Sequence, residues 1–386
     1  MRICLVYDCL FPHTVGGAER WYRSLAERLA ADGHEVTYLT LRQWDRGEDP
    51  GVEGVDVRVV GPRMHLYSSP GRRRILPPVV FGAGVLCHLI RHGARYEVVH
   101  TCSFPYFSLL AAALARRRRR YRLVVDWFEV WSRQYWREYL GTLGGDAGWL
   151  VQRLCARLPQ RAFCFSRLYA ARLREEGLRG ELTMLAGVYD GPLEAHEVRE
   201  PDPVIVFAGR HIPEKQVPAI VPAFVRARER IPQLRATILG DGPERAEVIR
   251  LVGELDLDGA VEVPGFVPSE RVDEDIARAL CMLLPSRREG YGLVVIEAAA
   301  SGTPSVVVAG PDNAAVELVS EGENGFIAES AAPEDLAAAI LRVHDAGPAL
   351  RDSTTAWFAR NAQRLSLAAS LEIALAVYGH ALSARS

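Results

Sequence analysis

The sequence predicts an α/β fold made of two doubly wound, parallel-sheet domains with a cleft between them. Short apolar runs rich in valine, isoleucine and leucine alternate along the chain with segments of helix length. These runs are continuously apolar, which is typical of parallel strands buried on both faces. They also fall into two series, one in each half of the chain, so we expect two sheets rather than one.

The two series of strands are separated by a segment with the composition of a linker. The first series is expected at residues 2–7, 35–40, 55–60, 96–101, 122–127 and 162–166. The second series is expected at residues 204–209, 235–240, 260–265, 281–285 and 304–308. Residues 189–203, "YDGPLEAHEVREPDP", combine Gly, three Pro and mixed charge without periodicity. We therefore predict domains at residues 1–190 and 191–365, followed by a helix at 366–386 that packs back on the first domain.

Composition limits the classes of function. The chain has 386 residues and a formal net charge of -2, so no global field draws it to nucleic acid. Its seven cysteines are odd in number and form no C-x-x-C pair, which favours reduced, buried thiols in a cytoplasmic protein. We expect no signal peptide and no membrane-spanning helix, because no uninterrupted apolar stretch approaches ~18 residues.

The segment "RHIPEKQVP", residues 210–218, contains Lys215, the only lysine in the chain. Arg210 and Lys215 follow a predicted buried strand, and ligands of open α/β sheets bind at the carboxyl ends of strands. Two cations at that place suit a diphosphate, and a compact ammonium is not freely exchanged for a planar guanidinium. The alternative is a surface lysine without a role.

A second motif, "REGYGLVVIE", places Glu289 and Glu297 eight residues apart. Glu297 is expected on a helix that starts near Gly292, with Glu289 in the loop before it. Carboxylates accept hydrogen bonds from vicinal sugar hydroxyls, and a helix N-terminus stabilises an anion by about 0.3–1 kcal/mol. Either glutamate taken singly also fits a solvated position.

The segment "HTVGGAER", residues 13–20, lies between the first strand and a predicted helix. Gly16 and Gly17 allow a tight turn and a close approach of the backbone to an anion. The spacing differs from the G-x-G-x-x-G dinucleotide fingerprint, so a simple turn between strand and helix remains an equal alternative.

These stretches, in this order, resemble the retaining glycosyltransferases of GT-B fold, in the large family numbered four. The resemblance covers nearly the whole chain, and the "GR…EK" and E-x7-E motifs are its specific part. It implies two Rossmann-like domains, an N-terminal one for the acceptor and a C-terminal one for the nucleotide sugar. It also implies transfer of a sugar from a nucleoside diphosphate sugar (UDP, GDP or another) to an acceptor hydroxyl, without a metal or other cofactor.

The resemblance also assigns roles to individual residues. Arg210 and Lys215 would hold the diphosphate, and Glu289 would bind the donor sugar together with the amides of Gly290, Tyr291, Gly292 and Leu293. Glu297 would bind the ribose, and the base would lie against the backbone near Val267. From the other domain, Gly16 and Gly17 would approach the phosphate or the acceptor.

One position departs from the family pattern. Phe128, in "VVDWFEVW", stands where many relatives carry a histidine that contacts the donor sugar. Asp126 or Glu129 are the candidates to replace that contact on the acceptor side. The departure keeps open two alternatives on the same fold, a nucleotide-sugar epimerase or hydrolase and a catalytically degenerate binding protein.

Three further features have two interpretations each. Arg116 to Arg120 form a run of five arginines that fits either a solvated helix end or a contact with anionic lipid. The aromatic segment 127–141 fits a hydrophobic cluster, an acceptor site or a membrane surface. "DED" at 273–275 matches a D-x-D metal pattern but lies in a polar helical run, so we predict no metal site. The acceptor is left as a glycan, a lipid-linked sugar or a small molecule, and peripheral contact at the inner membrane face stays open.

Overall fold

The structure is a computed structural model of the whole chain, and it describes residues 1–14, 16–45, 47–66, 73–194 and 200–383. Part of the predicted linker, residues 195–199, lies outside the described residues. The chain divides into two compact units. Unit 1 takes the described residues up to Val188 together with the last helix, and unit 2 takes those from Tyr189 to Ser366.

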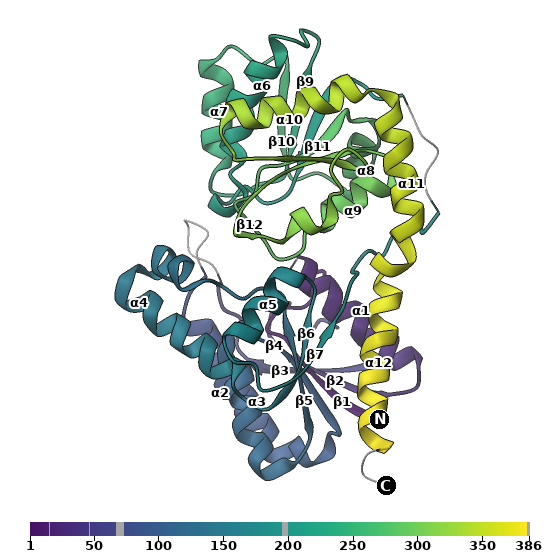
Figure 1. Cartoon of the computed structure of the whole chain (residues 1–386). Helices are drawn as coiled ribbons and strands as arrows, with labels where there is room; N and C mark the ends of the chain where they lie inside the picture. Colours follow the sequence, from purple (N-terminus) through teal and green to yellow (C-terminus); the bar gives the residue numbers. More distant parts are fainter. Residues whose placement is uncertain (15, 46, 67–72, 195–199, 384–386) are drawn as a thin grey trace. The chain divides into compact units, whose positions relative to one another are not determined.

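Unit 1 is a seven-stranded parallel sheet with helices on both faces (Figure 1). Its strands are β1 (Arg2–Val6), β2 (Glu35–Leu41), β3 (Val55–Gly61), β4 (Val98–Cys102), β5 (Arg122–Trp127), β6 (Gln160–Cys164) and β7 (Gly180–Met184). Its helices are α1 (Gly17–Ala31), α2 (Leu76–His92), α3 (Tyr106–Arg119), α4 (Arg133–Ala156), α5 (Arg167–Glu175) and α12 (Leu367–Ser383), with a 3-10 turn η1 (Gly93–Arg95). The strand order is β3-β2-β1-β4-β5-β6-β7, with α1 and α12 on one face and α2 and α3 on the other.

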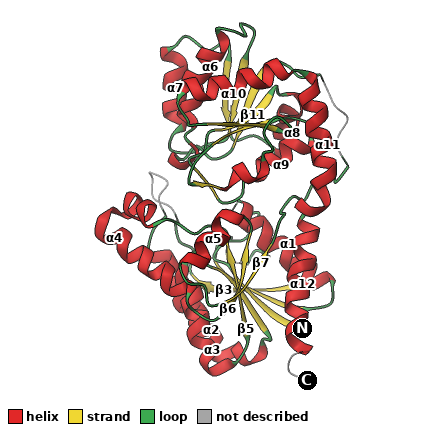
Figure 2. Ribbon diagram, in the orientation of Figure 1, coloured by secondary structure: helices red, strands yellow, loops and turns green. Residues whose placement is uncertain are grey.

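Unit 2 repeats this plan with a six-stranded parallel sheet, drawn as yellow strands between red helices in Figure 2. Its strands are β8 (Val204–Ala208), β9 (Arg235–Leu239), β10 (Val261–Gly265), β11 (Cys281–Leu284), β13 (Ser305–Val308) and β15 (Gly325–Ala328). Its helices are α6 (Ile220–Arg228), α7 (Arg245–Glu254), α8 (Ser269–Arg278), α9 (Leu293–Ala300), α10 (Pro333–Ala346) and α11 (Pro348–Leu365). Short pieces complete it: η2 (Pro213–Lys215), η3 (Val217–Ala219), η4 (Ala314–Leu318), β12 (Arg288–Glu289) and β14 (Asp312–Asn313).

The predicted fold class is confirmed. Each predicted strand is present, because the apolar runs supply the buried centre of both sheets. β7, "GELTM", was not predicted from the sequence. It is a half-exposed edge strand and so lacks the continuous apolar run of its neighbours.

The cysteine prediction needs one correction. All seven cysteines are free, and six are buried as expected, but Cys87 on α2 is exposed. It lies on the outer face of a helix whose sequence is apolar all round, so composition alone concealed its orientation.

A buried polar network lies at the centre of unit 1. Asp126, at the end of β5, is fully buried and accepts a hydrogen bond from Trp21 Nε1 at 2.7 Å. His100 Nε2 on β4 lies 2.9 Å from the other carboxylate oxygen, and the opposite ring nitrogen of His100 meets the hydroxyl of Tyr378 on α12. Arg122 also donates to the Tyr378 carbonyl at 2.8 Å. The network therefore anchors the last helix to the sheet of unit 1.

We predict that Tyr378→Phe destabilises unit 1 by about 1–3 kcal/mol, because it leaves a buried histidine nitrogen without its partner. Urea unfolding measures the loss. In a double-mutant cycle with His100→Ala, the two losses are expected to be less than additive. Additive losses would show that the two side chains do not act together.

Candidate active site

Each sheet has one point at which the strand order reverses. In unit 2 it lies between β8 and β11, which are neighbours in the sheet although two other strands separate them in the sequence. Loops that leave the carboxyl ends of two such strands diverge to opposite faces, and the crevice between them is the usual ligand site of a doubly wound sheet. The Arg210–Lys215 segment follows β8, and the Glu289 segment follows β11.

Lys215 and Glu289 form an ion pair between these two loops. Their side chains are 19% and 10% exposed, so the pair is largely removed from water. Ser286 donates its hydroxyl to the same glutamate oxygen, Oε1, at 2.8 Å. The backbone joins the loops as well, because the Arg287 amide donates to the Glu214 carbonyl at 2.9 Å. The two sides of the crevice are thus held together by side chains and main chain.

A second ion pair supports the first. Arg288 Nη2 lies 3.6 Å from Glu214 Oε1, and both side chains are largely buried. Burial lowers the pKa of the Arg288 guanidinium to about 10, which still leaves it charged near neutral pH. Because Glu214 directly precedes Lys215, and Arg288 directly precedes Glu289, the two pairs fix neighbouring points of the same loops.

Asn313 holds the Glu289 loop from the other side. β12 and β14 form a two-stranded parallel sheet in which Glu289 lies opposite Asn313. The fully buried Asn313 amide nitrogen donates to the carbonyls of Ser286 and Val308 at 2.9 and 2.8 Å. Its side-chain oxygen accepts from the Ala315 amide at 3.0 Å. These bonds explain why a loop can present a glutamate in a defined position.

Gly292 ends this loop and precedes α9, close to the helix start that the sequence predicts. Its φ of 98° lies in the left-handed region. A Cβ at this position would approach the Ala315 Cβ to 2.7 Å, so both backbone angle and space require glycine. The turn leaves the first amides of α9 without partners inside the helix, as at any helix start. Glu297 lies on α9 and is half-buried.

The other predicted donor-side residues lie on the same sheet edge. Arg210 is exposed in the loop after β8. Val267 follows β10, and its side chain packs against the cluster around Val206 and Leu239. Phe266, which the sequence analysis did not single out, is 78% exposed beside it. Gly290, Tyr291 and Leu293 are partly buried around Gly292.

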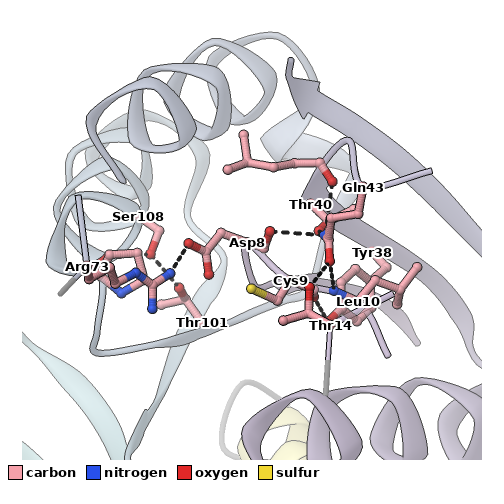
Figure 3. A network of polar contacts seen from close by, with 12 residues as sticks. Asp8, Cys9, Leu10, Thr14, Tyr38, Thr40, Gln43, Arg73, Thr101 and Ser108 are labelled. Carbon is pink, nitrogen blue, oxygen red and sulfur yellow. Dashed lines mark hydrogen bonds and ion pairs between the residues drawn. The ribbon is translucent and has the colours of Figure 1, made fainter. Parts of the chain in front are cut away.

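Unit 1 has its own reversal point between β1 and β4, and a buried ion pair occupies it (Figure 3). Asp8, just after β1, is fully buried and pairs with Arg73, whose side chain is 11% exposed. The Arg73 guanidinium carbon also lies 5.2 Å from the centre of the Phe104 ring, which follows β4. Arg73 therefore contacts the loops on both sides of this second crevice.

Gln43 shapes the loop that leads to Gly16 and Gly17 (Figure 3). Its amide donates to the Asp8 carbonyl at 3.2 Å, and its oxygen accepts from the Leu10 amide at 3.0 Å and from Thr14 Oγ1 at 2.5 Å. α1 then begins at Gly17, where a Cβ would meet open space. At Gly16, by contrast, a Cβ would collide with Glu19 Oε2, so the space around the two glycines is open at Gly17 alone.

The three candidates for the acceptor side lie in different surroundings. Asp126 is buried in the network with Trp21 and His100, so an acceptor does not reach it in this arrangement. Phe128 is half-buried and stacks on Phe165 with ring centres 4.6 Å apart. Glu129 accepts from Trp131 Nε1 at 2.6 Å and keeps partial exposure.

Several residues of the two crevices escaped the sequence analysis. Ser286 and Arg288 lie beside or within the quoted motif "REGYGLVVIE", whereas Asn313 lies outside it, and only the fold reveals their contacts with Glu289 and its loop. Asp8 and Arg73 are 65 residues apart, and no local pattern links them. The sequence signal that could have identified Asp8 is its position as a charged residue directly after the apolar run of β1.

No group of three or more histidine, cysteine, aspartate or glutamate side chains in the described part of the chain is placed to hold a metal ion. Within the same residues, no helix has the length and apolar character needed to cross a membrane.

Comparison with known proteins adds to this geometry. The family model "Glycosyl transferases group 1" matches residues 193–356, and "Glycosyl transferase 4-like domain" matches residues 16–186. Glycogen synthase from Mycobacterium tuberculosis is 31% identical over 382 residues, which cover 89% of this chain and 86% of that protein. Four other curated relatives are matched over only 14% to 42% of their length.

Solved structures share the fold over the whole chain. Sucrose-phosphate synthase from Thermosynechococcus elongatus has a TM-score of 0.80 at 20% identity and 99% coverage of both chains. Anabaena Alr3699/HepE, solved in complex with UDP-glucose, has a TM-score of 0.70 at 18% identity and 100% coverage of both chains. With a family match in each half and a full-length relative, this chain belongs to the GT4-type glycosyltransferases of GT-B fold.

Proposed function

We propose that this glycosyltransferase moves a sugar from a nucleoside diphosphate sugar to an acceptor hydroxyl, with retention of anomeric configuration and without a metal ion. The observation that supports it best is the Lys215–Glu289 pair at the reversal point of unit 2, directly before α9. It combines a cation, a carboxylate and the amides of a helix start, which suit a phosphate and the hydroxyls of a sugar. Anabaena HepE, which shares the fold, has been solved in complex with UDP-glucose.

The proposed roles follow the positions of the side chains. Lys215 and the exposed Arg210 hold the diphosphate, and Glu289 with the amides of residues 290–293 holds the donor sugar. Glu297 on α9 takes the ribose, and the base lies against the backbone near Val267. Ser286 and Asn313 position Glu289 without touching the substrate.

Sugar transfer from a diphosphate mainly requires electrostatic stabilisation of the leaving group. The bond between the anomeric carbon and the phosphate oxygen breaks with its electron pair on the diphosphate, and the acceptor oxygen bonds to the same face of the carbon. The acceptor proton passes to the departing β-phosphate. The negative charge that develops there is what Lys215 and Arg210 stabilise, and removing one such group costs about 3–4 kcal/mol of barrier.

We assign the acceptor to unit 1. The partly exposed Glu129 offers a charged group to a hydroxyl-bearing acceptor, and the buried Asp8–Arg73 pair joins the loops at the reversal point of the same unit. Gly16 and Gly17 retain the proposed role of close backbone approach to the phosphate or the acceptor. Gln43 supports this approach, because it fixes the loop that precedes the two glycines.

Phe128 favours one second candidate, a binding protein that holds the nucleotide sugar without transferring it. Its phenyl ring stacks on Phe165 and, unlike a histidine ring, has no group that could form a hydrogen bond with a donor sugar. Binding of a nucleoside diphosphate sugar with no turnover on any acceptor would select this alternative, and an epimerase or hydrolase would release a changed or free sugar without an acceptor.

We predict that Lys215→Ala lowers kcat/KM by roughly a hundredfold to a thousandfold, because it removes a cation aimed at the leaving phosphate. Lys215→Arg is expected to retain little activity, because a planar, forked guanidinium does not reproduce the compact point charge of the ammonium that pairs with Glu289. Steady-state kinetics with the donor provide the measurement.

Arg230→Ala is the matched control for the lysine variants. This exposed cation of unit 2 lies just past α6 and is expected to leave kcat/KM unchanged. A Lys215→Ala variant that transfers sugar as fast as the Arg230→Ala control would refute the role of Lys215.

We predict that Gly292→Ala weakens donor binding, because the left-handed φ and the contact with Ala315 force the α9 amides out of place. Calorimetric titration with the nucleotide sugar measures it. Gly253→Ala, in the exposed last turn of α7, has free space and is expected to leave binding unchanged and raise stability by about 0.4–1 kcal/mol. Equal donor affinities in the two variants would contradict the proposed use of these amides.

We predict that the product keeps the anomeric configuration of the donor and that EDTA leaves the rate unchanged. Proton NMR of the product, recorded before the anomers equilibrate, reports the configuration. An inverted product would exclude front-face substitution, and a rate abolished by EDTA and restored by Mg²⁺ would exclude the metal-free mechanism.

A further inference from the structure

The outward surface of three helices of unit 1 is apolar to an unusual degree. Of the fourteen exposed large hydrophobic residues in the described part of the chain, ten fall between Ile75 and Leu154. This stretch contains α2, α3 and α4, which lie along the same side of the unit 1 sheet (Figures 1 and 2). Exposed large apolar side chains that gather on one side of a unit, rather than occurring singly, are typical of an interaction site.

The exposed side chains recur at helical spacing on each helix. On α2, Leu76, Val79 and Ile90 are 63%, 40% and 40% exposed. On α3, Phe107 and Leu114 are seven residues apart. On α4, which is interrupted by a non-helical Gly141, Leu143, Leu150 and Leu154 follow the interruption and are 87%, 57% and 54% exposed. Each set forms a stripe along its helix that faces away from the sheet.

Cations gather at the C-terminal ends of two of these helices, α2 and α3. α2 and α3 contain no acidic residue, and their C-terminal turns carry arginines. Within the described residues, the side chains of Arg91, Arg95, Arg117, Arg118 and Arg120 are exposed and make no ion pair or hydrogen bond. The helix ends lie together, because Arg119 donates to the Ile90 carbonyl.

Hydrogen bonding to backbone carbonyls near the end of α3 accounts for only some of its arginines. Arg116 Nη1 donates to the Pro159 carbonyl at 2.5 Å, and Arg119 donates to Ile90, so these two already serve backbone carbonyls. Arg118 lies one turn after Leu114 and on the same side of α3, so its charge extends the apolar stripe. The pattern is an apolar face edged by unpaired positive charge.

We propose that the α2–α3–α4 face of unit 1 docks on an anionic phospholipid bilayer. The leucines and Phe107 would enter the boundary between headgroups and acyl chains, while the arginines meet lipid phosphates. A soluble polyanion would leave the apolar stripes unused. A second copy of the same face would bring unpaired arginines toward one another. The formal net charge of -2 makes the attraction local to this face.

The test is flotation of the full chain with vesicles of phosphatidylcholine alone or mixed with phosphatidylglycerol. We expect binding to the mixed vesicles only, weakening as salt rises. The variant R117Q/R118Q/R120Q is expected to lower the partition coefficient roughly a hundredfold. L143Q/L150Q/L154Q is expected to lower it as well while keeping the helix-forming propensity of leucine.

The matched control is R230Q/R235Q/R364Q, which removes three exposed arginines of unit 2 and the same total charge. It is expected to bind vesicles like the parent chain, and circular dichroism with thermal melts confirms that all variants fold. The proposal is overturned if the parent chain does not float with anionic vesicles, or if the control loses as much binding as the α3 variant. It is also overturned if the leucine variant binds normally, which assigns the arginines to a soluble polyanion, or if that variant converts a dimer to a monomer.

Discussion

The ion pair between Lys215 and Glu289 is the interaction on which the architecture of the unit 2 site depends. Strands β8 and β11 send their loops toward opposite faces of the sheet, and the ion pair joins the two sides of the crevice between them. The pair does so together with the Arg287–Glu214 backbone bond and the Arg288–Glu214 contact. A mostly buried ion pair stays favourable only with further hydrogen bonds, and Ser286 supplies one. In the proposed function, the diphosphate of the donor would meet a lysine already oriented by its glutamate.

The polarity of the sheets explains why the fold was predictable. Because all paired strands are parallel, the central strands are covered on both faces and appear in the sequence as continuous apolar runs. The same polarity gathers the loops after β8, β10 and β11 at one edge, so motifs far apart in the sequence were expected together. β7 was missed because an edge strand with exposed residues carries no such signal, and the two-residue strands β12 and β14 are too short to give one.

The long-range polar contacts of unit 1 were beyond local patterns. Trp21 and Asp126 are 105 residues apart, His100 and Tyr378 are 278 apart, and Asp8 and Arg73 are 65 apart. The first two contacts join a helix to a strand and the third joins two loops, and tertiary folding alone brings the partners near. Asp126 illustrates the difficulty: in the sequence it is a carboxylate beside an unusual Phe128, whereas in the fold it is a buried partner of Trp21 and His100. Its contacts in the fold, and not its neighbours in the sequence, show that this carboxylate supports the sheet.

The surface arginines of α2 and α3 differ in their ion pairing from those on the helices of unit 2. On unit 2, several surface arginines are paired within their own helix, as in Arg250 with Glu247 and Glu254, Arg271 with Asp275 and Arg278 with Glu274. Such exposed pairs add little stability, but they cancel charge locally. α2 and α3 of unit 1 carry cations with no acid on either helix, beside exposed leucines. A chain with almost equal numbers of acids and bases thus keeps unpaired positive charge on one apolar face. Neither folding nor solubility requires that arrangement, whereas a lipid surface that is apolar within and anionic outside matches both of its parts.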